Sequence, residues 1–236
     1  MPIGLGVTLG IGGGKPATSS GAPPASGFDN SKSCHFDGVD DHIAVTSFNF
    51  ASEKTLSYWI KLDSISSAGI YIFGKGAAYY TYLTSNGQTI YIYAPPTATS
   101  FSLGSTHAIT TGSWIHIAIV GDGSTATLYK NGASIATTTD VTPQGVNRFG
   151  GDSVGGSRFV HGNMDEVAYW DSTLSASTIS DIYNSGTPTD LSGLSPVHWW
   201  RMGDGDTFST LTDHGSGSNN GTMTNMDAAD IVTVVP

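Results

Sequence analysis

Residues 159–186 contain a helix pattern that constrains the fold more than any other part of the chain. Apolar side chains recur at helical spacing over Leu174–Tyr183, Ser175 is a suitable N-cap, and Gly186 can adopt the left-handed conformation that ends a helix. We expect a strand over residues 164–170, then a helix that begins after Ser175 and ends at Gly186. A chain whose other patterns are strands and turns must pack sheet on sheet, so we expect this helix to plug an end or an edge.

Strand patterns bounded by turn residues fill most of the remaining chain. Asn131 and Gly132 predict a two-residue hairpin, because both central positions of a type I′ turn need positive φ. The pattern predicts one all-β sandwich over residues 28–236, preceded by a glycine-rich arm and a Pro/Ser linker over residues 1–27, and a polar loop over residues 203–220. We expect strands at residues 34–36, 55–62, 70–74, 79–84, 89–93, 101–103, 114–120, 125–130, 197–202 and 230–235, with a strand end at 149.

Charge and cysteine content exclude several features. The formal net charge is −10, from 9 basic and 19 acidic residues, so the chain lacks the basic surface that nucleic-acid binding needs. Cys34 is the single cysteine, which excludes an intramolecular disulfide, and its neighbours predict a buried side chain. Because no run approaches about 18 apolar residues, the sequence predicts no membrane span.

Four sequence motifs, in order along the chain, carry a resemblance to a known family. They are SCHFDGVDDHIAV at 33–45, TLSYWIKL at 55–62, WIHIAIVGDGSTATLYKNGASI at 114–135 and GNMDEVAYWDSTLSASTISDIYNSG at 162–186. These motifs resemble those of concanavalin A-like, laminin-G-like domains. The resemblance implies an all-β, concanavalin A-like (laminin-G-like) jelly-roll β-sandwich with one short helix.

The two ends of the chain carry a second resemblance. MPIGLGVTLG at the start, WWRMGDGDT at 199–207 and the final 17 residues, NGTMTNMDAADIVTVVP at 220–236, are similar to structural proteins of tailed phages. This resemblance implies a non-enzymatic virion component of the capsid decoration, tail or fibre, exposed on the particle surface and partnered with other virion proteins and with copies of itself. Its anchor would be the N-terminal arm or the C-terminal strand. The alternative is a secreted or cell-surface lectin module that binds carbohydrate.

Glycoside hydrolysis, which some members of this fold class perform, needs a pair of carboxylates across the scissile bond. In the glucanases of the fold that this chain resembles, the two carboxylates belong to a strand motif E-x-D-x-x-E. When the aspartate of this motif is aligned with Asp165, the chain has Asn163 and Ala168 in place of the two glutamates. We also expect Asp165 and Glu166 to point to opposite faces of a strand, because side chains alternate along it. The sequence therefore predicts that the protein is not an enzyme.

Acidic residues near the first motif predict a calcium site, although no cofactor is required. Asp37, Asp40 and Asp41 share one turn, and Asp165 would join Asp37 and Asp40 if the first and last motif strands are neighbours, giving the oxygen ligands that Ca²⁺ prefers. Alternatively, these carboxylates cap the turn and bind backbone amides. The seven histidines show no metal-binding spacing. A second acidic loop contains Asp204, Asp206 and Asp213.

Tyrosines on two successive strand patterns are the candidate carbohydrate-binding residues. Alternation places Tyr80 and Tyr82 on one face of their strand, and Tyr91 and Tyr93 on one face of the next. Such rings can stack on sugars beside polar loop groups. The alternative is that they pack within the sheet or against a neighbouring protomer.

Overall fold

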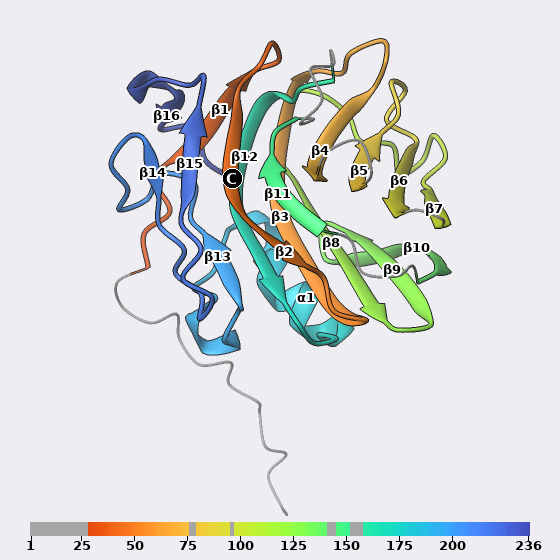
Figure 1. Cartoon of the computed structure of the whole chain (residues 1–236). Helices are drawn as coiled ribbons and strands as arrows, with labels where there is room; N and C mark the ends of the chain where they lie inside the picture. The colour runs from red at the N-terminus through yellow and green to blue at the C-terminus, as the bar shows by residue number, and fades with distance from the viewer. Residues whose placement is uncertain (1–27, 76–78, 95–96, 141–144, 152–157) are drawn as a thin grey trace, which may run out of the picture.

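Two antiparallel sheets packed face to face account for the strand patterns of the sequence (Figure 1). The computed structural model describes residues 28–75, 79–94, 97–140, 145–151 and 158–236; the predicted arm and linker at 1–27 lie outside this range. Sheet A has, in spatial order, β10 (Ala133–Thr139), β9 (Thr125–Lys130), β8 (Ile115–Asp122), β3 (Glu53–Ser64), β12 (His161–Trp170), β1 (Ser33–Asp37) and β16 (Ile231–Val232), with β13 (His198–Trp200) also beside β12.

Sheet B forms the second layer. Its spatial order is β14 (Thr210–Leu211), β15 (Gly221–Thr224), β2 (His42–Asn49), β11 (Gly145–Phe149), β4 (Ile70–Lys75), β5 (Tyr79–Leu83), β6 (Thr89–Ala94) and β7 (Thr97–Ser102). The predicted β-sandwich is therefore confirmed. The hairpin between β9 and β10 is also confirmed, with φ of 51° at Asn131 and 76° at Gly132.

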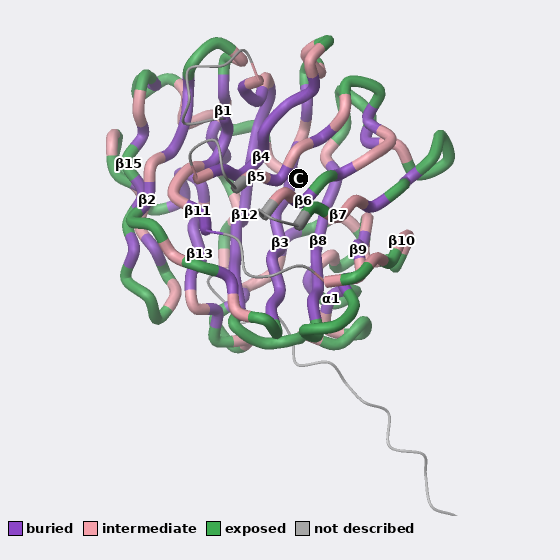
Figure 2. The backbone as a smooth tube through the Cα atoms, turned by 45° about the vertical axis from the view of Figure 1, so that its right-hand side comes forward, coloured by how far each residue is buried: buried purple, intermediate pink, exposed green. Residues whose placement is uncertain are grey.

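The main core lies between the sheets and follows the two-residue period of the strands (Figure 2). On β3, Tyr58, Ile60 and Leu62 point inward, while the residues between them point to the outer face of sheet A. Cys34 is fully buried in this core, as predicted, and burial raises the pKa of its thiol above the usual value, so it packs as an apolar side chain.

The helix α1 (Ala176–Tyr183) covers a sheet face instead of plugging an end. The Ser175 hydroxyl caps it by accepting the Thr178 amide at 3.1 Å, as predicted. It ends before Gly186, because Asn184 and Ser185 already take left-handed φ values of 42° and 58°. Three 3₁₀ turns follow at Asn184–Gly186, Ser192–Leu194 and Ala228–Asp230.

A second, smaller core separates α1 from the outer face of sheet A. Ile179 and Ile182 of the helix pack there with outward-facing residues of the sheet, namely Ala118, Val120, Tyr129, Ala168 and Trp170, and with Leu191 and Trp199. The part of the outer face of sheet A formed by β8, β9 and β12 is therefore covered by apolar contacts. Within the described residues, no helix is long and apolar enough to cross a membrane.

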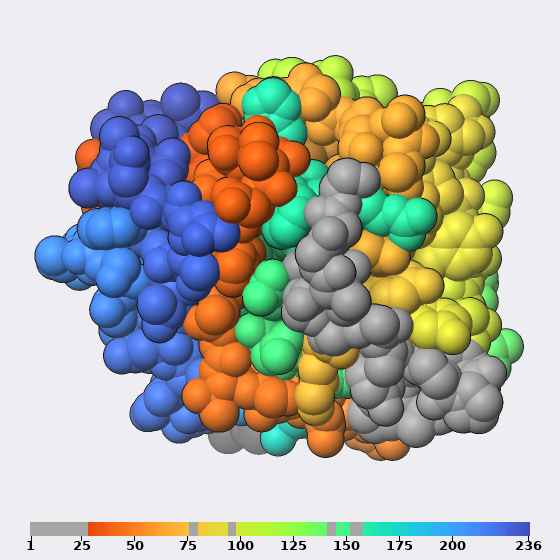
Figure 3. Space-filling view, turned by 45° about the horizontal axis from the view of Figure 1, so that its top comes forward, coloured from red at the N-terminus to blue at the C-terminus, as the bar shows by residue number. Residues whose placement is uncertain are grey.

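The C-terminal residues complete both sheets. The closing strand predicted at 230–235 is present only over Ile231–Val232, as β16, which pairs with β1, while β15 pairs with β2 and β13 with β12. Figure 3 shows the C-terminal residues beside the first strands of the chain. The polar loop predicted over 203–220 contains the short strand β14, and residues 221–224 form β15, which the sequence pattern missed.

A β-bulge in β12 corrects one prediction. Asp165 lies opposite Trp59 of β3, but the next paired residue is Ala168, opposite Ser57, and Glu166 has a φ of 46°. The extra residue shifts the alternation, so Met164 and Val167 both point into the main core. Asp165 and Glu166 consequently share the outer face of sheet A instead of opposite faces.

Candidate functional site

The four predicted tyrosines lie together on the outer face of sheet B. Tyr80 of β5 is paired with Tyr93 of β6, and Tyr82 with Tyr91. The residues that alternate with the tyrosines, among them Leu83, Ile90 and Ile92, are buried in the main core, and this alternation turns all four rings outward. The sequence prediction that each pair shares one face is confirmed, and pairing of the strands brings the two pairs together.

The ring geometry differs between the two cross-strand pairs. Tyr80 and Tyr93 stack with centroids 4.9 Å apart at an interplanar angle of 18°. Tyr82 and Tyr91 are tilted at 42° with centroids 6.1 Å apart. Tyr91 is 41% exposed, whereas the other three are half-buried, so Tyr91 offers the most accessible ring.

Two residues that the sequence reasoning missed extend this cluster. The Tyr71 ring of β4 lies 4.6 Å from that of Tyr80 and 5.5 Å from that of Tyr82. Arg158 donates from Nη1 to the Tyr71 hydroxyl at 2.6 Å, and its guanidinium lies 5.2 Å above the Tyr71 ring and 5.3 Å above that of Tyr82. We call Tyr71, Tyr80, Tyr82, Tyr91, Tyr93 and Arg158 the tyrosine face.

The tyrosine face is held in place by its own polar contacts. The Tyr82 hydroxyl donates to the Ala68 carbonyl at 2.7 Å, and the Tyr71 amide donates to the Arg158 carbonyl at 2.9 Å. Burial, followed by the neighbouring Tyr71 and Tyr93 hydroxyls, raises the pKa of Tyr80, so this phenol stays neutral. The surface thus presents rigid aromatic area with hydroxyl and guanidinium groups, a combination common in binding surfaces.

The strands that carry the tyrosine face have no acidic side chain. Residues 64–121, which include β4, β5, β6 and β7, contain neither aspartate nor glutamate. Among the described residues, Arg158 has no carboxylate within ion-pair distance.

The predicted calcium residues are only partly brought together. Oxygens of Asp37, Asp40 and Asp41 lie within 4.8 Å of one another in the turn between β1 and β2, but Asp165 is not in this group. The Asp37 carboxylate caps the turn by accepting the Val39 amide at 2.7 Å, and Asp41 accepts the Asp37 amide at 2.9 Å. Burial raises the pKa of Asp41 to about 6. Calcium binding by Asp37, Asp40 or Asp165 stays a prediction.

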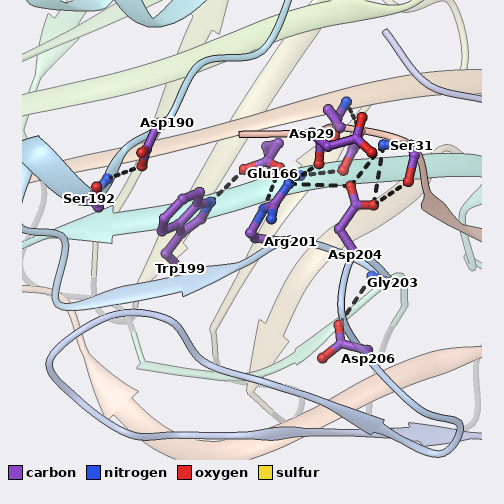
Figure 4. Close-up of polar contacts among 12 residues, drawn as sticks. Asp29, Ser31, Glu166, Asp190, Ser192, Trp199, Arg201, Gly203, Asp204 and Asp206 are labelled. Atoms are coloured by element: carbon purple, nitrogen blue, oxygen red, sulfur yellow. Dashed lines mark hydrogen bonds and ion pairs between the residues drawn. The ribbon is translucent and has the colours of Figure 1, made fainter. Parts of the chain in front are cut away.

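Asp165 instead belongs to a buried acidic group behind sheet A, part of which Figure 4 shows. Its carboxylate accepts from Asn30 at 3.0 Å, and Glu166 accepts from the Trp199 indole at 2.5 Å and from Arg201 at 3.3 Å. Burial raises the pKa of both carboxyls, that of Glu166 to about 7. Both are almost fully buried, so these contacts serve the packing of the strand.

The second acidic loop is spread over three separate contacts. Asp204 accepts from the Ser31 hydroxyl at 2.7 Å, Asp206 accepts the Gly203 and Thr212 amides, and Asp213 bonds to the His198 ring at 2.7 Å. Each carboxylate is therefore used by a backbone or side-chain partner, and the three do not form one ligand group among the described residues.

The two stacked antiparallel sheets, with an aromatic outer face on one of them, define a concanavalin A-like β-sandwich. A family model described as Laminin_G_3, concanavalin A-like lectin/glucanases superfamily, matches residues 14–180. The chain belongs to this family. No curated protein sequence matches it.

Three solved structures show the same fold. One, with a TM-score of 0.67 and 17% identity, is a Bacteroides ovatus protein whose assignment as carbohydrate-binding is provisional; the match covers 88% of this chain and 61% of that one. A heptameric SAP-like pentraxin from Limulus polyphemus matches with a TM-score of 0.50 and 18% identity, and the match covers 65% of this chain and 82% of the pentraxin chain. Domain 4 of an extracellular GH43 arabinanase from Geobacillus stearothermophilus, in complex with arabinotriose, matches with a TM-score of 0.52 and 16% identity, and the match covers 64% of this chain and 76% of that chain. The chain thus spans less than two thirds of the first structure. None of these comparisons points to a phage virion.

Proposed function

We propose that the protein is a non-catalytic carbohydrate-binding module that binds glycans on its tyrosine face. The observation that carries the proposal is the cluster of Tyr71, Tyr80, Tyr82, Tyr91 and Tyr93 on one outer sheet face beside Arg158. Rigid aromatic rings supply contact area at a small cost in conformational entropy, and their hydroxyls supply hydrogen bonds at the rim. The carbohydrate-related descriptions of two structures with the same fold support this class of ligand.

The charge of the face favours neutral or acidic glycans over basic ones. Arg158 is its cation, and residues 64–121 supply no carboxylate to attract a basic sugar. A guanidinium can pair with a carboxylate in two parallel hydrogen bonds, so uronic acids are a ligand class to compare with neutral arabinans and xylans. The same absence of acidic side chains supports binding without hydrolysis.

A glycan array and titration calorimetry test the proposal. We expect the full chain to bind at least one neutral or acidic polysaccharide, and Tyr91→Ala to weaken binding by roughly three- to tenfold, the loss of about 0.5–1.5 kcal/mol of ring contact. Phe208→Ala is the matched control, because Phe208 is also 41% exposed but lies near β14, at the opposite edge of sheet B. Binding to no glycan, with or without a chelator, would sink the proposal.

Attachment to a phage particle is a separate prediction. If a phage genome encodes this chain, mass spectrometry of the purified phage particle should detect the polypeptide among the structural proteins. Its absence there would leave the carbohydrate-binding proposal intact and would remove the virion location.

A further inference from the structure

Two histidines and an aspartate, distant in sequence, meet on the outer face of sheet A. His35 lies on β1, His161 on β12 and Asp63 on β3, and one ring nitrogen of each histidine and a carboxylate oxygen of Asp63 all lie within 4.8 Å of one another. These three strands are neighbours in the order β3, β12, β1. We propose that His35, His161 and Asp63 bind a divalent transition metal ion, with Zn²⁺ as the ion to test.

The register of the strands explains why the three side chains converge. His161 is paired with Ser64 of β3, the residue after Asp63, and with Asp37 of β1, which lies two residues from His35 on the same face of that strand. Cys34, Phe36 and Leu62, the chain neighbours of the ligands, are buried in the main core, so the ligands point to the outer face. The register between β12 and β3 shifts between His161 and Gly162, so Asp63 lies at a β-bulge of this strand pair.

The distances are close to those of a metal site before the ion binds. The Nε2 atom of His35 lies 3.3 Å from Oδ2 of Asp63, which is about the separation of two ligands that each lie about 2.0–2.2 Å from a tetrahedral Zn²⁺. The two imidazole rings meet edge to face with centroids 6.2 Å apart. A ring nitrogen of His161 lies within 4.8 Å of a ligand atom of each of the other two residues, so we expect the three ligand atoms to move closer together when the ion binds.

His161 has the outer contact that metal-binding histidines usually have. Its Nδ1 lies 2.9 Å from the Ser64 hydroxyl, so an Nδ1 proton donated to Ser64 leaves Nε2 as the ligand atom. Gly38 packs against the same side chain, because a Cβ at Gly38 would lie 2.7 Å from the Cβ of His161. These two contacts restrict the ring on both sides.

The donor set and the exposure define the ion. Two imidazoles and one carboxylate suit Zn²⁺, Ni²⁺ or Cu²⁺, whereas Ca²⁺ prefers oxygen ligands alone. The side chains of His35 and Asp63 are 31% and 39% exposed, so an ion can enter from solvent and keep water at its remaining positions. The alternative is a plain His35 to Asp63 ion pair, which needs nothing from His161.

Titration calorimetry of Zn²⁺ into the chelator-treated full chain, at neutral pH, tests the site. We expect one Zn²⁺ per chain, undiminished by excess Ca²⁺. His35→Ala and His161→Ala should each weaken binding by at least about 100-fold, and Ser64→Ala by about 10–100-fold, as for outer contacts elsewhere. His107→Ala and His214→Ala, two exposed histidines elsewhere, should leave binding unchanged.

Thermal melting separates loss of the site from loss of the fold. Without metal, the ligand variants should melt within a few degrees of the wild type, since the changed side chains are partly exposed. With Zn²⁺, the melting temperature of the wild type should rise and that of His161→Ala should not. Absence of Zn²⁺ binding in the wild type, or equal binding by His161→Ala, would overturn the proposal, as would loss of binding in His107→Ala.

Discussion

Tyr80 of β5 and Tyr93 of β6 lie directly opposite each other, and their rings stack with centroids 4.9 Å apart. The rings of the next pair along the same strands, Tyr82 and Tyr91, are tilted relative to each other, with centroids 6.1 Å apart. The same two strands therefore contain a close ring contact and a looser one of identical chemistry. This difference gives a measurement with its own internal comparison.

We predict a larger coupling energy for the stacked pair. A double-mutant cycle with Tyr80→Ala and Tyr93→Ala, measured by urea unfolding, should give about 0.5–1.5 kcal/mol. The cycle of Tyr82→Ala and Tyr91→Ala should give less. Equal coupling in the two cycles would show that ring stacking contributes nothing specific to sheet B.

Lys54 and Asp140 form a buried ion pair at 2.6 Å, with side chains 7% and 2% exposed. Lys54→Met should lower the free energy of unfolding by about 3–5 kcal/mol, because Asp140 keeps a buried charge without its partner. Adding Asp140→Leu should restore most of this loss. Lys61→Met, a lysine without an ion pair among the described residues, is the control and should change stability by less than about 0.5 kcal/mol.

The burial of Glu166 predicts that stability falls as the pH rises. Its pKa moves from 4.5 in the unfolded chain to about 7 in the folded protein, chiefly through desolvation. Between these values the folded state binds more protons at Glu166, so the contribution of Glu166 to stability decreases from about pH 4.5 to about pH 7, by on the order of 3 kcal/mol. Relative to the wild type, Glu166→Gln should therefore lose less stability as the pH rises from 5 to 7, measured by urea unfolding. Asp181→Asn, on the exposed face of α1, should leave the pH dependence of stability unchanged.

His116 contributes a change of the opposite sign over an overlapping pH range. It is fully buried beside Ser57, and desolvation lowers its pKa from 6.5 to about 3. The unfolded chain then binds the extra proton below pH 6.5, so the contribution of His116 to stability falls by about 2 kcal/mol between pH 7 and pH 5, which is measured as the difference between the wild type and the variant. His116→Gln should remove this fall, and His107→Gln, at an exposed position, should retain it. A fall of unchanged size in His116→Gln would show that another group causes it.

Local patterns predicted the parts of the structure that local physics decides. Alternation placed Tyr80, Tyr82, Tyr91 and Tyr93 on strand faces, and the need for positive φ placed the turn at Asn131 and Gly132. The N-cap at Ser175 follows from a hydrogen bond within one turn. Each of these features depends on residues close together in the chain.

Features that depend on strand pairing could not be predicted in the same way. The bulge at Glu166 is visible only in the register between β12 and β3. Strand alternation without a bulge predicts that Asp165 and Glu166 point to opposite faces. Arg158 reaches Tyr71 and Tyr82 because residue 158 pairs with β4. His35 and His161 are far apart in sequence, so no spacing along the chain reveals that they meet.

Phe28 is the first residue that the structure describes, and it is held on the outer face of sheet A. Its ring stacks on Trp199 at 6.3 Å, the guanidinium of Arg201 lies 4.5 Å above it, and the adjacent Asp29 carbonyl accepts from Arg201, all behind sheet A. The tyrosine face belongs to the other sheet and looks the opposite way. Phe28 and the tyrosine face therefore lie on opposite sides of the sandwich, so the stacking of Phe28 on Trp199 takes up no part of the proposed binding surface.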